Sequence, residues 1–155
     1  MKVTLTVVVA VFLLVSVVAA WAAPAAVLPK GYHSWKKSVR KVDTDKSSIF
    51  YGIHYIYADK TALKGYLAGN RFAEGSRIVV DYFNIKGSPD VDGPKNMVVL
   101  MRKDKRFKQT GGWQFAGFGA DGKPSGLDPV TTCFGCHVKD AAQKDFVIST
   151  KKDFL

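Results

Sequence analysis

Residues 76–86 read SRIVVDYFNIK, which is the longest strand-like run in this chain. β-branched and aromatic residues are enriched in strands, where successive side chains point to opposite faces. The alternation divides the side chains into two sets, with Ile78, Val80 and Tyr82 on one face and Val79, Asp81, Phe83 and Ile85 on the other. Because both sets are mostly apolar, the pattern predicts a strand covered on both sides.

Three further runs predict the neighbours of this strand, at 49–57, 96–102 and 113–118. The connections are short and rich in turn-forming residues, including a loop at 87–94, so we expect antiparallel pairing. A last run at 146–148 is a candidate fifth strand that would close the sheet.

Two short helices are predicted beside the sheet. Asp59 is an N-cap for a helix that ends at 68–70, and Asp128-Pro129 begins a second helix near the C-terminus. A helical turn at 31–37 would dock Trp35 inward. The predicted fold class is therefore α+β, an antiparallel β-sheet flanked by short helices.

Composition indicates one folded domain. The chain has 155 residues, of which 47% are hydrophobic and 23% charged, so a disordered chain is excluded. The formal net charge of +10 favours acidic partners. We expect no nucleic-acid binding, because the basic residues are spread along the chain without a recognition motif.

The N-terminus predicts export. Lys2 precedes a long apolar run, and Ala20-Trp21-Ala22 is an A-x-A cleavage site. We therefore expect a signal peptide at 1–22, a linker at 23–30 and the folded domain at 31–155. The alternative is an uncleaved leader helix that tethers the domain to a membrane.

Near the C-terminus the sequence reads Cys133-Phe134-Gly135-Cys136-His137, the C-x-x-C-H pattern of covalent haem c attachment. On a helix, positions i, i+3 and i+4 share a face, so two thiols can bond the haem vinyl groups while the imidazole reaches the iron. The sequence thus predicts one covalent haem c, bound by Cys133 and Cys136, with His137 as the metal ligand.

Three other interpretations of the two cysteines are weaker. A zinc site would need two more ligands, and only His33 and His54 remain among the non-carboxylate candidates. A thiol redox pair normally follows a strand at a helix start, whereas a Gly- and Pro-containing loop precedes this motif. A structural disulfide across two intervening residues is strained on a helix.

The sixth iron ligand decides between electron transfer and ligand binding. Its candidates are His33, His54, Met97 and Met101. The alternation of Met97 and Met101 with Val99 is typical of core methionines, and His33 near the linker is expected to be exposed. His54 lies in an aromatic strand, where it is either a satisfied core histidine or part of the haem pocket.

With these residues in place, the mature chain resembles the cytochrome P-460 family, which includes the cytochromes c′-beta. The matching blocks are PKGY at 29–32 with Trp35, IHYIYAD at 53–59, FAEGS at 72–76, KDKRF at 103–107, GWQF at 112–115 and TCFGCH at 132–137. The resemblance implies an antiparallel sheet with helices around it, a homodimer and a five-coordinate haem c that takes small nitrogen species. The leader peptide adds the expectation of a periplasmic location.

The resemblance also implies which chemistry is missing. Enzymatic members, which oxidise hydroxylamine, carry a lysine cross-linked to the haem, and counting along the strand places Val80 there. They also use a distal carboxylate on the next strand, where 96–101 contains no acid, and His54 stands where they have an arginine. These departures favour a cytochrome c′-beta-like protein that binds nitric oxide rather than an enzyme.

Two alternatives stay open at this point. One is a hydroxylamine-oxidising cytochrome P-460, and the other is a six-coordinate electron carrier that docks an acidic redox partner. Either would share the haem-attachment residues of the first hypothesis but would differ in what lies on the distal side of the iron.

The attachment motif and the leader give a first testable prediction. Mass spectrometry of the exported protein should show loss of residues 1–22 and gain of one haem that survives acid-acetone extraction. A haem that extracts into the solvent would contradict attachment through Cys133 and Cys136.

Overall fold

The computed structural model describes residues 25–155. The predicted signal peptide and its cleavage site lie outside these residues. Among the helices in the described part of the chain, none is both long and apolar enough to cross a membrane.

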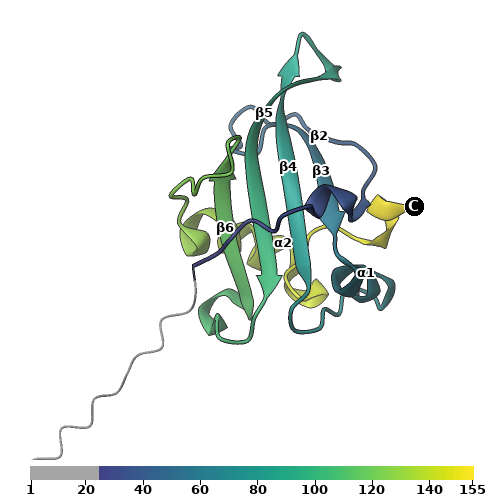
Figure 1. The fold of residues 1–155 in the computed structure, drawn as a ribbon, viewed down its shortest axis with the longest axis vertical. Helices are drawn as coiled ribbons and strands as arrows, with labels where there is room; N and C mark the ends of the chain where they lie inside the picture. The colour runs from purple at the N-terminus through teal and green to yellow at the C-terminus, as the bar shows by residue number, and fades with distance from the viewer. Residues whose placement is uncertain (1–24) are drawn as a thin grey trace, which may run out of the picture.

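One antiparallel sheet of six strands organises the molecule (Figure 1). Its order is β1-β3-β4-β5-β6, and β2 pairs with β3. The strands are β1 (Lys36–Lys37), β2 (Lys41–Asp43), β3 (Gly52–Ala58), β4 (Arg77–Lys86), β5 (Ser88–Lys103) and β6 (Trp113–Gly119). The predicted central strand is confirmed, since β4 lies between β3 and β5.

The helices are short, which confirms the predicted α+β class. They are α1 (Lys60–Leu67), a π-helix (Pro129–Phe134), α2 (Gly135–Ala141) and four 3₁₀ helices, η1 (Tyr32–Ser34), η2 (Lys108–Thr110), η4 (Ala142–Lys144) and η5 (Lys151–Phe154). Asp59 caps α1 by accepting a hydrogen bond from the Ala62 amide at 2.8 Å. Asp128 caps the π-helix that leads into α2.

Each face of the sheet has its own apolar cluster, as the alternation in β4 predicts. One cluster joins the sheet to α1 and the C-terminal segment, and it includes Ile56, Ile78, Met101, Trp113 and Cys133. The second cluster includes Tyr57, Val79, Val98, Leu100 and Phe118 together with Tyr32 from the N-terminal segment. In Figure 1 the N-terminal segment crosses the sheet on this second face.

The predicted loop at 87–94 is wrong in most of its length. β5 begins at Ser88, so β4 and β5 form a hairpin that turns at Gly87, where φ is +76°. The tip extends beyond the other strands (Figure 1). Register shifts between Tyr82 and Lys86 mark an irregular ladder there. The sequence did not predict this part of the strand, because its residues have a high propensity for turns. Cross-strand hydrogen bonds maintain the strand in spite of that propensity.

Other boundaries also differ from the sequence prediction. No strand forms at 146–148, because Asp145 and Phe146 both have positive φ and turn the backbone away from the sheet. β3 starts at Gly52 rather than residue 49, since the Tyr51 amide closes a turn onto the Ser48 carbonyl at 3.1 Å. β1 and β2 were not predicted, because they are two and three residues long and rich in lysine.

The packing of α1 gives a stability prediction. A Cβ at Gly65 would overlap the ring of Phe72, which is buried edge-on against Tyr66 and Trp113. Gly65→Ala gains about 1 kcal/mol of helix propensity, but overpacking costs about 1–3 kcal/mol. We expect a net loss of stability in urea unfolding, whereas the exposed neighbour Lys64→Ala should change it by less than about 0.5 kcal/mol. A more stable Gly65→Ala protein would contradict this packing.

Candidate functional site

A cavity of about 290 Å³ lies between one face of the sheet and the C-terminal segment. All five residues predicted for the site line it: Cys133, Cys136, His137, His54 and Val80. The sequence separates His54 from His137 by more than 80 positions, and the sheet brings them to the same space.

The sheet forms an apolar wall of this cavity. Val80 in β4 pairs with Ile56 in β3 on one side and with Val99 in β5 on the other. All three side chains line the cavity, together with Ile78 and Met101 from the next row. Cross-strand neighbours point to the same face, so the wall is continuous across three strands.

The opposite side carries the two thiols. Asp128 accepts hydrogen bonds from the amides of Val130 at 3.0 Å and Thr131 at 2.6 Å, which fixes the start of the π-helix. Cys133 ends up buried and Cys136 exposed, and both are free thiols. Burial raises the pKa of Cys133, with smaller contributions from Asp128 and Cys136, so this thiol is protonated at neutral pH.

His137 is oriented by one backbone hydrogen bond. Its Nδ1 lies 2.7 Å from the carbonyl oxygen of Phe146. Because a carbonyl only accepts, Nδ1 carries the proton and the Nε2 lone pair is left free. Burial lowers the pKa of His137, although the bond to Phe146 and the charge of Asp140 act in the other direction. A neutral imidazole with a fixed tautomer is the form that binds iron.

His54 points into the cavity without a hydrogen-bond partner for Nδ1, which is buried. Its ring lies 5.1 Å from the ring of Tyr82, centroid to centroid. Burial lowers the pKa of His54, the charge of Lys41 lowers it further, and Asp43 and Asp153 oppose both. The interpretation as a satisfied core histidine is therefore wrong, and the cavity interpretation remains.

Polar residues that the sequence did not single out complete the lining. Lys41 Nζ donates to Asp153 Oδ1 at 2.7 Å, and the Thr150 amide donates to Asp153 Oδ2 at 2.7 Å. Asp43 also lines the cavity. Lys41 in β2 lies beside His54, because these two residues are paired across β2 and β3. No pattern in the sequence predicts the contact between Lys41 and Asp153 near the C-terminus.

Phe50 is another lining residue outside the predicted set. Its ring is tilted by 36° relative to that of Tyr82, with centroids 5.3 Å apart. Phe50 belongs to the aromatic run 49–57 that was predicted as a strand, but the structure places this residue in a turn.

The four candidates for a sixth iron ligand separate clearly. His33 is exposed, as predicted, and bonds Asp81 on the opposite face of the sheet at 3.1 Å. Met101 is buried in the core and lines the cavity, whereas Met97 is not among the lining residues. His54 and Met101 are therefore the candidates that the cavity retains.

This arrangement fits a haem c. Two thiols and a neutral imidazole reach the cavity from one segment, an apolar wall faces them, and one buried imidazole nitrogen is unpaired. Within residues 25–155, no three His, Cys, Asp or Glu side chains gather into a metal site of their own. Cys133 and Cys136 would hold the macrocycle and His137 its iron.

Comparison with known families agrees with this geometry. A family model described as Cytochrome P460 matches residues 29–149, which include every block quoted above and the whole attachment motif. A search of curated proteins finds no match. Because the match covers most of the chain, the protein belongs to the cytochrome P460 family and is a haem cytochrome.

Proposed function

We propose that this protein is an exported monohaem c cytochrome whose five-coordinate iron binds nitric oxide or a related small nitrogen species. Cys133 and Cys136 form the two thioether bonds, and His137 is the axial ligand. The haem held by these residues would supply the iron at which a small ligand binds.

The apolar wall around Val80 carries this proposal. Enzymatic members of the family have a cross-linking lysine in place of Val80, as judged from the sequence resemblance, and here the position is filled by a side chain with two methyl groups. Val80 sits between Ile56 and Val99, so no amine is presented at the centre of the wall. Lys41 is the only lysine among the lining residues, and its amine is held by Asp153.

An apolar wall selects among ligands through desolvation. Charged or strongly hydrated species lose several kcal/mol of solvation on entering such a space, whereas a neutral diatomic loses little. His54 differs from the other polar lining residues that we describe, because its buried Nδ1 has no hydrogen-bond partner and can form a hydrogen bond toward the cavity. We propose that His54 contacts the bound ligand or its surroundings without ligating iron.

One observation favours the second candidate, a hydroxylamine-oxidising enzyme. Although 96–101 contains no acid, Asp43 and Asp153 both line the cavity. Burial alone would raise the pKa of Asp153, but the hydrogen bonds from Lys41 and the Thr150 amide lower it below its usual value, so the carboxylate is ionised at neutral pH. An ionised carboxylate already paired with a lysine is a weak proton acceptor, and we therefore rank this function second.

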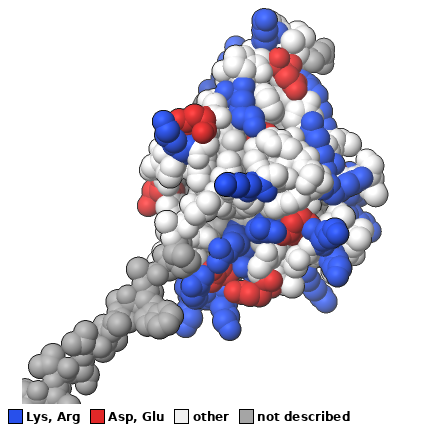
Figure 2. Space-filling model, in the orientation of Figure 1, with Lys and Arg blue, Asp and Glu red and all other residues white. Residues whose placement is uncertain are grey.

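We further propose a periplasmic location, a homodimer and an acidic electron-transfer partner. The leader at 1–22 supports export, and the net charge of +10 supports attraction to an acidic surface. Figure 2 shows Lys and Arg side chains over the visible face, with acidic side chains between them. The homodimer is inferred from the family resemblance alone.

Val80 provides a test of binding against catalysis. The wild-type protein should bind nitric oxide, lack the red-shifted spectrum of a cross-linked haem and turn over hydroxylamine weakly or not at all. Val80→Lys should acquire the cross-link spectrum after oxidation, and Val80→Met serves as the control because it is longer than valine but has no amine. A wild-type tryptic peptide with haem mass on any lysine outside 133–137 would contradict the proposal.

His54 provides a test of coordination. The ferric spectrum should be high-spin in both wild type and His54→Ala, and loss of one hydrogen bond should weaken nitric oxide binding by about 2- to 12-fold, equivalent to about 0.5–1.5 kcal/mol. His33→Ala is the matched control, because His33 lies on the opposite face of the sheet. A change from low-spin to high-spin on removing His54 would identify it as a ligand and favour the electron carrier.

A further inference from the structure

We propose that Lys103 and Asp145 are positioning residues for His137. They act through the carbonyl group of Phe146, the hydrogen-bond acceptor of His137 Nδ1. This inference rests on the proposed role of His137 as an iron ligand. It assigns a function to the ion pair between Lys103 and Asp145, which belongs to the side of the site that holds His137.

The acceptor carbonyl belongs to an unusual piece of backbone. Asp145 and Phe146 are consecutive residues with φ of +51° and +59°. The left-handed region is unfavourable for residues with a side chain, and two in succession require the surroundings to maintain them. The direction of the Phe146 carbonyl therefore depends on whatever holds these two residues.

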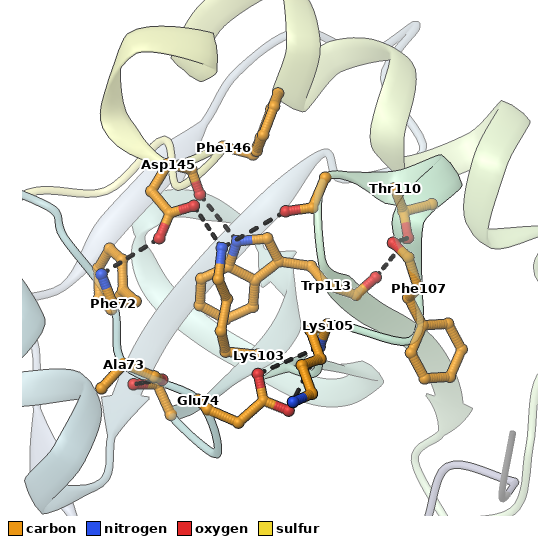
Figure 3. Close-up of polar contacts among 12 residues, drawn as sticks. Phe72, Ala73, Glu74, Lys103, Lys105, Phe107, Thr110, Trp113, Asp145 and Phe146 are labelled. Atoms are coloured by element: carbon orange, nitrogen blue, oxygen red, sulfur yellow. Dashed lines mark hydrogen bonds and ion pairs between the residues drawn. The ribbon is translucent and has the colours of Figure 1, made fainter.

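Asp145 is held from three directions, which Figure 3 shows together. Lys103 at the end of β5 makes an ion pair with its carboxylate. The Phe72 amide donates to the second carboxylate oxygen at 3.1 Å, and the indole Nε1 of Trp113 donates to the Asp145 carbonyl at 2.8 Å. Asp145 is thus tied to the sheet and to the segment that follows α1.

Phe146 is held on the other side of the turn. Its amide donates to the Ala141 carbonyl at 2.9 Å, and its ring packs on Gly111, where a Cβ would overlap the ring. The ring also lies 5.2 Å from that of Phe134, centroid to centroid. With its amide and ring fixed, its carbonyl is presented to His137.

Lys103 is well placed to control this turn. Its side chain is only 17% exposed, its ammonium lies 4.9 Å from the centre of the Trp113 ring, and it also donates to the Gly111 carbonyl at 3.4 Å. One ammonium therefore joins Asp145 to Trp113 and to the glycine under Phe146. Removing it would release several contacts of the turn together.

The effect on iron follows from the hydrogen bond. A strong bond from Nδ1–H to a carbonyl makes an imidazole a better electron donor and fixes its orientation. If the turn relaxes, the Phe146 carbonyl moves away from Nδ1 and the donation weakens. The iron–histidine bond then weakens, and the ferrous state is favoured over the ferric state.

The test compares purified holoproteins by resonance Raman spectroscopy and by redox titration. Lys103→Met and Asp145→Asn should each lower the iron–histidine stretching frequency and raise the reduction potential. The double variant should shift both by no more than the larger single change, because the two residues act as a unit. Lys123→Met is the matched control, since it removes an exposed ion pair with Asp121 and should change neither quantity.

Two further variants keep the result decisive. Lys103→Arg preserves the charge and should return both readouts toward wild type. Asp145→Asn tolerates positive φ and retains an acceptor for Phe72, so it remains informative if Lys103→Met does not fold. A wild-type stretching frequency and potential in folded Asp145→Asn holoprotein would overturn the proposal. Absence of an iron–histidine band in the wild type would instead overturn the proposed function, and the positioning role with it.

Discussion

The whole structure depends on burial of β4 from both sides. Val79 and Ile78 are neighbours in sequence and face opposite ways, yet each is at most 1% exposed. A sheet with two apolar faces needs two covering layers. The N-terminal segment supplies one layer, and α1 with the C-terminal segment supplies the other, so both layers pack against the same strand.

The two faces of the sheet are covered in different ways. On the face covered by the N-terminal segment, the carboxyl group of Asp81 is buried. It bonds the Tyr32 hydroxyl at 2.5 Å, Lys95 Nζ at 2.9 Å and His33 Nε2 at 3.1 Å, which offset the cost of its burial. Burial and the hydrogen bond to Asp81 raise the pKa of Tyr32 far above its usual value. Tyr32 and His33 thus bond the N-terminal segment to this face, whereas the cavity lies on the opposite face of the sheet.

The residues most easily predicted were those governed by local rules. Period-two alternation located β4 and its two faces, and the spacing from Cys133 to His137 gave the attachment motif without any tertiary information. The sequence even placed Val80 on the cavity face, because alternation fixes direction once the strand is known.

The missed features depend on contacts between distant parts of the chain. β2 is a three-residue strand with exposed Val42, and only its pairing with β3 brings Lys41 to the cavity. The ion pair between Lys41 and Asp153 joins residues that are 112 positions apart in the sequence. The 146–148 segment has strand propensity but does not form a strand, since the turn at Asp145 is maintained by groups from β5 and β6. Propensity cannot anticipate such restraints.

The cavity between the sheet and the C-terminal segment is therefore shaped by two kinds of constraint. On the sheet side the constraint is chemical: Ile56, Val80 and Val99 form an apolar wall, and the buried Nδ1 of His54 beside it has no hydrogen-bond partner. On the C-terminal side the constraint is geometric, because His137 is oriented by a backbone carbonyl rather than by a side chain. Substitutions on the sheet can thus change the lining of the cavity while leaving the orientation of His137 unchanged.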